Sequence, residues 1–155
     1  MGLQTIEQAV KPPPFLDLKD DGSYSLHFHT GQARVWNSDA RWVAMISGTQ
    51  VGKTEFGPHW LRREIQHRTP SETTADYLAV SPTFPLMNLK MKPAFLRVFE
   101  GLHGMGTWRE ADKIFVSHEK TKVGEPAWRV LFGSADRPES LEAATARAAW
   151  LDEAG

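Results

Sequence analysis

Two short groups of residues, far apart in the chain, have types that suit phosphate chemistry. The first is Gly52-Lys53-Thr54, which follows an apolar run at residues 42–46 and precedes a segment with helical spacing. A buried strand that enters a Gly-Lys-Thr loop at the start of a helix is typical of proteins that bind nucleoside triphosphates. In such loops the backbone N–H groups point at the phosphates, the lysine reaches the β- and γ-phosphates, and the threonine hydroxyl ligates Mg²⁺. The predicted nucleotide-binding residues of this loop are Gly48, Thr49, Gln50, Val51, Gly52, Lys53 and Thr54.

The loop departs from the full phosphate-loop pattern at one position. The pattern has a glycine five positions before Gly52, where this chain has Ser47, and Gly48 comes one place later. Small residues tolerate the tight turn nearly as well as glycine does. The departure therefore weakens the prediction of a phosphate loop without removing it.

The second group is Asp152-Glu153, which ends the apolar run at residues 148–151. In phosphate-loop enzymes, a carboxylate at the C-terminal tip of a neighbouring strand holds the Mg²⁺ shell. In those that hydrolyse ATP to drive movement, a second acid directly after it polarises the attacking water. We therefore expect Thr54 and Asp152 to hold Mg²⁺. The expected catalytic residues are Glu153, as the base, and Lys53, at the phosphates. Each pattern alone arises often by chance, so the prediction depends on their combination in this order.

Two residues upstream of the loop suit the recognition of a base. The amide of Gln32 can pair with both N6–H and N7 of adenine, and the ring of Trp36 can stack on a base. The same stretch is equally well explained as a helix with one exposed glutamine and one buried tryptophan. The residues themselves leave both interpretations open.

Composition limits the classes of function. The chain has 155 residues, of which 41% are hydrophobic and 24% charged, and these values are typical of one globular domain. A net charge of −1 gives no global attraction to nucleic acid or to an anionic membrane. The absence of cysteine excludes disulfides and thiol nucleophiles and fits a cytoplasmic location. No apolar run has the length of a membrane span, and no Gly-x-Ser-x-Gly motif anchors a hydrolase triad.

The pattern of apolar and turn residues predicts alternating strands and helices. We expect a lead-in at residues 1–30 with a short strand at 24–29, and one domain at 31–155. Alternation of strands and helices favours a parallel sheet built from βαβ units. Proline is expected to bend the first helix at Pro58 and to be either a break or a fresh start of the second at Pro93. The expected elements are a strand at 42–46, a helix at 53–67, a strand at 77–80, a helix at 85–100, a loop at 101–106, a hairpin of strands 113–116 and 128–132, a helical turn at 141–146 and a strand at 148–151.

Several stretches of the sequence resemble those of a known protein family. From about Gly31 to Gly155 the chain resembles the large terminase subunit of tailed bacteriophages, the ATPase motor that packs DNA into capsids. The similarity rests on Gln32 with Arg41, on SGTQVGKTEFGPHWL, on YLAVSPTFPLMNLKMKPAFLRVF and on FGSADRPESLEAATARAAWLDEAG. The resemblance implies a RecA-like P-loop NTPase fold of the ASCE group, a three-layer α/β sandwich with a mainly parallel sheet. It also implies that Gln32 contacts adenine and that Ser81-Pro82-Thr83 forms a strand-end motif facing the adenine and DNA side.

The chain departs from the family in two ways. Many terminases have an arginine in the phosphate loop where this chain has Thr49, so Arg137, Arg147 or a neighbouring subunit would have to supply that charge. The family's motor also continues past its Asp-Glu pair into further strands and a nuclease domain, whereas this sequence stops two residues after Glu153. We therefore expect a P-loop domain that is incomplete at its C-terminal edge, and no nuclease activity.

The resemblance implies a function and a set of partners. The expected activity is Mg²⁺-dependent ATP hydrolysis coupled to translocation of double-stranded DNA into the capsid, in the bacterial host cytoplasm. The expected partners are DNA, the portal, the small terminase subunit and further copies of the chain in a ring, with no membrane. Two alternatives remain open: a fragment of a helicase-like P-loop ATPase, and a non-catalytic remnant that binds only a nucleotide or a partner.

Overall fold

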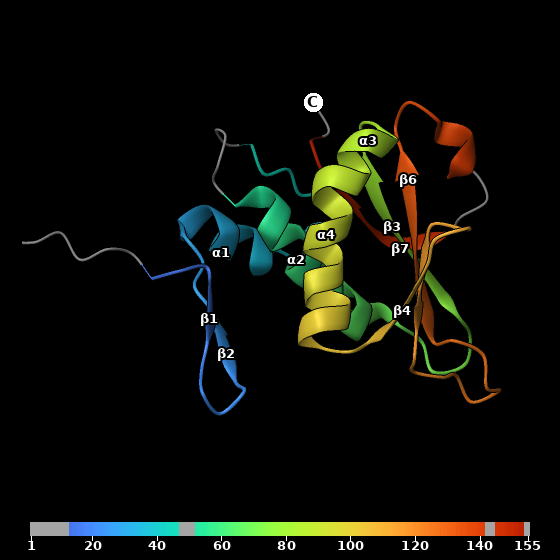
Figure 1. The fold of residues 1–155 in the computed structure, drawn as a ribbon, viewed down its shortest axis with the longest axis horizontal. Coiled ribbons are helices and arrows are strands. Elements are labelled where there is room, and N and C mark those ends of the chain that lie inside the picture. Colours follow the sequence, from blue (N-terminus) through green and yellow to red (C-terminus); the bar gives the residue numbers. More distant parts are fainter. Residues whose placement is uncertain (1–12, 47–51, 142–144, 154–155) are drawn as a thin grey trace, which may run out of the picture. The chain divides into compact units, whose positions relative to one another are not determined.

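The computed structural model describes residues 13–46, 52–141 and 145–153 (Figure 1). The chain divides into two compact units, Met1–Ser47 and Gly48–Gly155. Among the described residues, no helix combines the length and the apolar character needed to cross a membrane.

The N-terminal unit contains a hairpin and a short helix. Strands β1 (Leu16–Leu18) and β2 (Tyr24–Leu26) pair antiparallel, and helix α1 (Thr30–Trp36) follows them. Gly22 makes the expected turn between the strands, with a φ of 81° that favours glycine. Strand β2 lies within the strand predicted at 24–29 but ends earlier, at Leu26.

The prediction of a buried strand at residues 42–46 was wrong. These residues have no regular secondary structure, and the side chains of Trp42 and Ile46 are 80% and 95% exposed. A strand is stable only when its backbone N–H and C=O groups pair with a neighbouring strand. None of the described strands pairs with this segment, so an apolar sequence alone does not make it one.

The C-terminal unit is built around a five-stranded mixed sheet with the order β4-β5-β6-β3-β7. Strand β3 lies between β6 and β7 and runs parallel to both, whereas β5 runs antiparallel to its two neighbours, β4 and β6. The unit therefore has an α/β fold in which only the core of the sheet is parallel. The strands are β3 (Ala75–Ser81), β4 (Gly106–Arg109), β5 (Ile114–Ser117), β6 (Trp128–Ser134) and β7 (Ala146–Leu151).

The helices agree with the predicted segments, and a new α-helical stretch starts beside Pro93, which was expected to break or restart the second helix. Helix α2 (Lys53–Arg68) runs through Pro58 without interruption. The second helical segment is also continuous, because π-helical turns alternate with α-helical ones along it. In the turn before Pro93, the N–H of Lys92 donates to the carbonyl of Met87, and this wider turn accommodates a ring that would clash in a regular α-helix. Its parts are α3 (Phe84–Leu86), η1 (Met87–Met91), α4 (Lys92–Leu96) and η2 (Arg97–Leu102).

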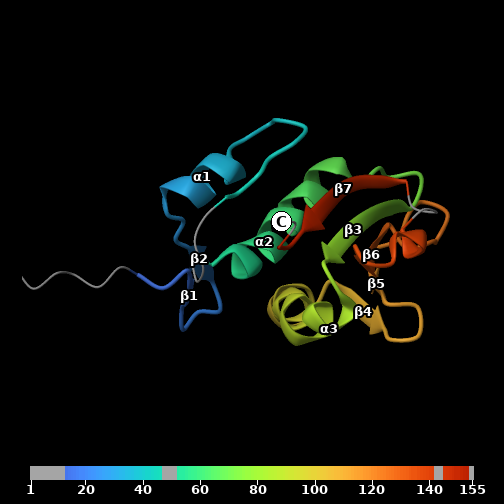
Figure 2. The same cartoon turned by 90° about the horizontal axis from the view of Figure 1, so that it is seen from above.

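The core lies between one face of the sheet and both helical segments, which share that side (Figures 1 and 2). Strand residues whose side chains point to this face alternate with residues on the other face, as the pleat requires. Tyr77 and Ala79 are fully buried there, whereas Leu78 between them is only half-buried. An aromatic cluster fills the centre, with ring centroids 4.0–6.0 Å apart, and is formed by Phe95, Phe99, Phe115, Trp128 and Phe132.

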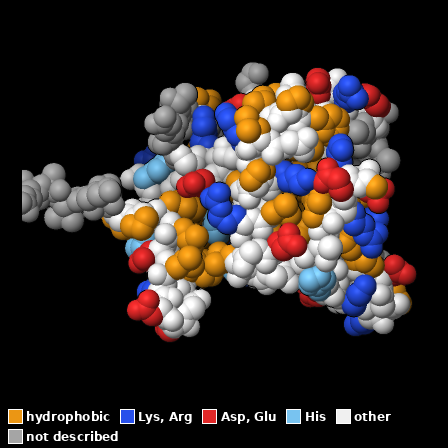
Figure 3. All heavy atoms as spheres, viewed as in Figure 1, with side chains coloured by type: hydrophobic (Ala, Val, Ile, Leu, Met, Phe, Trp, Pro, Cys, Tyr) orange, Lys and Arg blue, Asp and Glu red, His pale blue; other side chains and the backbone are white. Residues whose placement is uncertain are grey.

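The surface is mixed in character. On the face seen in Figure 3, Lys and Arg side chains are interspersed with Asp and Glu. Several charged side chains of the described residues form ion pairs, such as the bidentate pair in which Arg129 donates to both oxygens of Asp76 at 2.9 Å. The surface seen there is consistent with the small net charge of the chain.

Buried His59 makes the free energy of unfolding depend on pH. His59 lies on α2 with a 4% exposed side chain, and burial, aided by His103 and Arg62, lowers its pKa from 6.5 to about 4. Between these two values the unfolded chain takes up a proton that the folded protein does not. The protein should therefore lose stability as the pH falls from about 6.5 to about 4, by at most about 3 kcal/mol.

Urea denaturation at a series of pH values tests this expectation. His59→Gln should reduce the slope of the profile between pH 4 and 6.5, and the slope that remains is the contribution of His103, whose pKa burial also lowers. His67→Gln, at an exposed histidine on the same helix, should leave the profile like that of the wild type. A wild-type profile that is flat in this range would contradict the role of His59.

Candidate functional site

The first turn of α2 places Lys53 and Thr54 at the start of a long helix. Gly52 precedes the helix with φ 72° and ψ 22°, the left-handed conformation that glycine adopts without strain, and its carbonyl accepts the N–H of Phe56 at 2.9 Å. The N-terminus of a helix carries free N–H groups and a positive partial charge, both of which favour an anion. The other predicted loop residues, Gly48, Thr49, Gln50 and Val51, lie outside the described residues.

The structure brings Thr54 and Asp152 into contact, although 98 positions separate them. The Thr54 hydroxyl donates to the Asp152 carboxylate, with Oγ1 at 3.1 Å from Oδ2 and 3.3 Å from Oδ1. Asp152 directly follows β7, and its backbone N–H donates to the carbonyl of Val80 at 2.9 Å. The predicted loop residue and the predicted strand-tip acid therefore meet at the carboxyl edge of the parallel strands.

Close packing of α2 on β7 allows this contact. A Cβ atom added to Gly57 would lie 2.1–2.5 Å from three atoms of the Trp150 indole ring. Only a residue without a side chain can therefore occupy this position while Trp150 stays in place. Gly57 comes one helical turn after Thr54 and Trp150 lies two residues before Asp152, so the packing sets the spacing between the two polar side chains.

Burial makes Asp152 a suitable ligand for a cation. Its side chain is 7% exposed, and loss of solvent raises its pKa above the ordinary value of 3.8. The hydrogen bond from Thr54 opposes that rise, the charge of Glu153 adds to it, and Lys90 and Lys53 lower the pKa. A desolvated carboxylate is stabilised by a positive charge beside it.

The donor atoms of Thr54 and Asp152 fit Mg²⁺. Magnesium prefers hard oxygen ligands and is usually held by one or two carboxylates together with substrate phosphates and water. Thr54 and Asp152 supply one hydroxyl and one carboxylate at the same point. Within the described ranges no cluster of three or more His, Cys, Asp or Glu side chains is arranged to bind a metal.

Glu153 lies at the same edge of the sheet and is oriented by a lysine that the sequence did not indicate. Its Oε1 is 3.3 Å from Nζ of Lys90, and both side chains are about half exposed. Lys90 comes from the π-helical turn η1, 63 positions earlier in the chain. No sequence signal links the two residues, because their proximity depends on how the second helical segment packs against the sheet.

Gln32 belongs to the N-terminal unit, where it takes part in a helix cap. Its Oε1 accepts the backbone N–H of His29 at 3.2 Å, and Nδ1 of His29 accepts the N–H groups of Gly31 and Gln32. The helix that was one of the two open interpretations is present, but Gln32 is buried in it rather than exposed. Trp36 packs against Phe28 with ring centroids 4.9 Å apart.

The carboxyl ends of β3 and β6 carry two further polar residues beside this site. Ser81 and Ser134 are paired in the parallel register, and both are buried. The two following loops are joined, since the N–H of Ala135 donates to the carbonyl of Ser81 at 2.9 Å. The Ser134 hydroxyl is buried and has no hydrogen-bond partner in the described part of the chain. Ligands of open α/β sheets usually bind along this edge.

The two candidate arginines lie at opposite ends of the parallel strands. Arg137 follows the C-terminal end of β6, at the edge where Asp152 lies. Arg147 is the second residue of β7, so about 16 Å of extended strand separates it from Asp152. Of the two, Arg137 is therefore better placed to contribute a charge to the candidate site.

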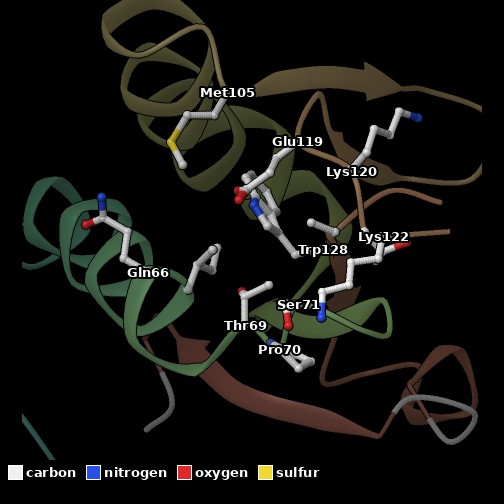
Figure 4. Close-up of a pocket in the computed structure, with 12 residues that line it drawn as sticks. Gln66, Thr69, Pro70, Ser71, Met105, Glu119, Lys120, Lys122 and Trp128 are labelled. Carbon is white, nitrogen blue, oxygen red and sulfur yellow. The ribbon is translucent and has the colours of Figure 1, made fainter. Parts of the chain in front are cut away.

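A cavity of about 600 Å³ lies elsewhere (Figure 4). It is lined by the C-terminal end of α2, including Gln66 and Thr69, and by the start of β6 at Trp128. These residues lie near the amino-terminal ends of the parallel strands, and Gln66 is some 18 Å along α2 from Thr54. The cavity shares no lining residue with the candidate site, so the chemistry described above does not take place in it.

No protein-family model matches the chain, and no curated protein or solved structure is similar to it.

Proposed function

We propose that the chain is a nucleotide-binding domain of the P-loop type that hydrolyses ATP with Mg²⁺. The observation that carries the proposal is the hydrogen bond between Thr54, at the start of α2, and Asp152, at the tip of β7. The two residues belong to separate sequence patterns, 98 positions apart in the chain. Two unrelated coincidental patterns would have no reason to meet in space.

The chemistry of the site follows from its own residues. Lys53 and the N–H groups at the start of α2 attract the triphosphate. Thr54 and Asp152 hold Mg²⁺, which when bound would neutralise phosphate charge. Glu153, exposed next to Asp152, accepts a proton from the attacking water. Arg137 is the candidate for the charge that arginine supplies in many related loops.

The finer fold that we propose is a RecA-like P-loop domain of the ASCE group. Its support is the parallel order β6-β3-β7, with α2 packed on β7 and both polar groups at the carboxyl edge. Strand β7 is the edge strand among the described strands, and its Leu151 is half exposed. A sheet of this fold would add strands beyond β7, and helices on its second face would complete three layers.

The biological role that we propose is that of the motor of a phage terminase large subunit, which couples ATP hydrolysis to translocation of double-stranded DNA. Its support is the resemblance of the four sequence stretches given above. The portal, the small terminase subunit and a ring of further copies are partners that this role implies. A helicase-like ATPase shares the same site and differs only in the domain that would accompany it.

A calorimetric titration with ATP and Mg²⁺ tests the proposal. We expect the wild type to bind ATP, and we expect Lys53→Ala to weaken binding roughly 10- to 100-fold, because an ammonium contact with phosphate contributes about 1.5–3 kcal/mol. Lys122→Ala removes another exposed lysine, paired with Glu72 and remote from the site, and should leave the affinity unchanged. Equal binding by the wild type and Lys53→Ala, or no binding by the wild type, would refute the nucleotide site.

A further inference from the structure

Lys90 lies where its ammonium group can orient the side chain of Glu153. Its Nζ contacts Oε1 of Glu153 at 3.3 Å, and its backbone belongs to the π-helical turn η1. Turns of this kind are often found at functional sites. The other lysine of the same segment, Lys92, points elsewhere, because its Nζ lies 2.5 Å from the carboxylate of Glu110 and over the ring of Trp108. Lys90 is thus the lysine of this segment that contacts the Asp152-Glu153 pair.

Glu153 has a backbone conformation that needs support. Its φ is 54°, in the left-handed region that residues with a Cβ atom seldom occupy. The chain is anchored just before it, where the N–H of Asp152 donates to the carbonyl of Val80. Beyond this anchor, the Lys90 contact is the described interaction that orients the Glu153 side chain. Such outlying conformations persist where the surroundings hold them, and they are frequent at functional sites.

We infer that Lys90 is a positioning residue, whose ammonium group holds the Glu153 carboxylate beside Asp152 in the direction that proton acceptance from the attacking water requires. This inference rests on the function proposed above. A salt bridge at this exposure adds little to stability, so removing it should leave the fold intact, and a change in rate then reports on the position of the Glu153 carboxylate. A reacting group displaced by about 1 Å can lose on the order of 100-fold in rate, so even partial loss of orientation is measurable.

Steady-state ATP hydrolysis by the full chain tests the inference. Lys90→Ala should lower kcat on the order of tenfold with KM changed less than about twofold, because the contact acts on the base and not on nucleotide binding. Lys90→Arg keeps a positive charge within reach of Glu153 and should restore most of kcat. Lys122→Ala, which removes an exposed and ion-paired lysine far from the site, should match the wild type. If Lys90 had a purely structural role, Lys90→Ala would lower thermal stability and would not lower kcat selectively while KM stays nearly unchanged.

A zero-length cross-link provides a measurement that does not depend on turnover. A carbodiimide joins a lysine amine to a carboxylate only when the two are in contact, so mass spectrometry of the digested wild type should show an amide bond between Lys90 and Glu153. The pair Lys122 and Glu72 serves as the positive control for the reagent. Lys90→Arg should lose the Lys90–Glu153 cross-link, because a guanidinium does not form this amide.

The outcomes separate the inference from the proposed function. If the wild type hydrolyses ATP and Lys90→Ala has an unchanged or higher kcat, the positioning role is refuted while the ATPase stands. If the wild type binds ATP without measurable turnover, the absence of the cross-link refutes the role and its presence supports it. A wild type that neither binds nor hydrolyses ATP refutes the proposed function, and the positioning role with it.

Discussion

Replacing Glu153 by glutamine is expected to lower the rate of ATP hydrolysis on the order of 10²- to 10⁴-fold while ATP affinity stays within about threefold of the wild type. Glutamine has the size and shape of glutamate but cannot accept a proton from water. Glu153 follows Asp152 at the tip of β7 and is exposed, so its replacement leaves the contact between Asp152 and Thr54 in place. Phosphate release measures the rate, and calorimetry measures the affinity.

A second glutamate near the same edge of the sheet provides the control. Glu139, in the short helix η3 (Pro138–Ser140) that follows β6, is also exposed, so Glu139→Gln removes the same charge without removing the proposed base. We expect this variant to hydrolyse ATP at the wild-type rate. Should Glu153→Gln turn over normally while Lys53→Ala is inactive, the assignment of Glu153 as the base would be wrong and the nucleotide site would remain.

Replacing Gly57 by alanine is expected to destabilise the protein by about 3 kcal/mol. In an exposed helix the same change would stabilise by about 1 kcal/mol, because alanine is the better helix former. Here the new methyl group would lie 2.1 Å from the Trp150 ring, so α2 and β7 must separate or the indole must move. The sign of the effect therefore distinguishes packing from helix propensity, and urea denaturation measures it.

Two further variants make the Gly57 test specific. Gly101 also lies in a helical turn, but a Cβ there would meet nothing closer than 3.8 Å, so Gly101→Ala should be neutral or slightly stabilising. Trp150→Leu removes the ring atoms that the new methyl group would meet. Adding Gly57→Ala to Trp150→Leu should then cost much less than adding it to the wild type. A Gly57→Ala protein as stable as the wild type would show that the close approach of α2 and β7 does not exist in solution.

The strands and helices of the C-terminal unit could largely be predicted from the sequence. The helix expected at 53–67 is α2, the hairpin expected at 113–116 and 128–132 is β5 and β6, and the strand expected at 148–151 is part of β7. Strand β4 was not predicted, because Gly106–Arg109 has neither length nor apolar alternation. It is a strand because its backbone pairs with β5. The prediction for residues 42–46 fails for the opposite reason. These residues have the composition of a strand, but none of the described strands pairs with them.

The sequence by itself determined the residue types of the candidate site and the elements that carry them. Gly-Lys-Thr at a helix start and Asp-Glu after an apolar run are local patterns, and local patterns depend only on the nearest neighbours along the chain. Only the tertiary structure decided that Thr54 and Asp152 touch, that Gly57 must be a glycine, and that Lys90 contacts Glu153. These facts depend on strand order and on the packing of helices on the sheet, which arise from contacts between residues far apart in the sequence. The Gly-Lys-Thr tripeptide indicates a phosphate site, and the packing of α2 on β7 supplies the acid that would complete it.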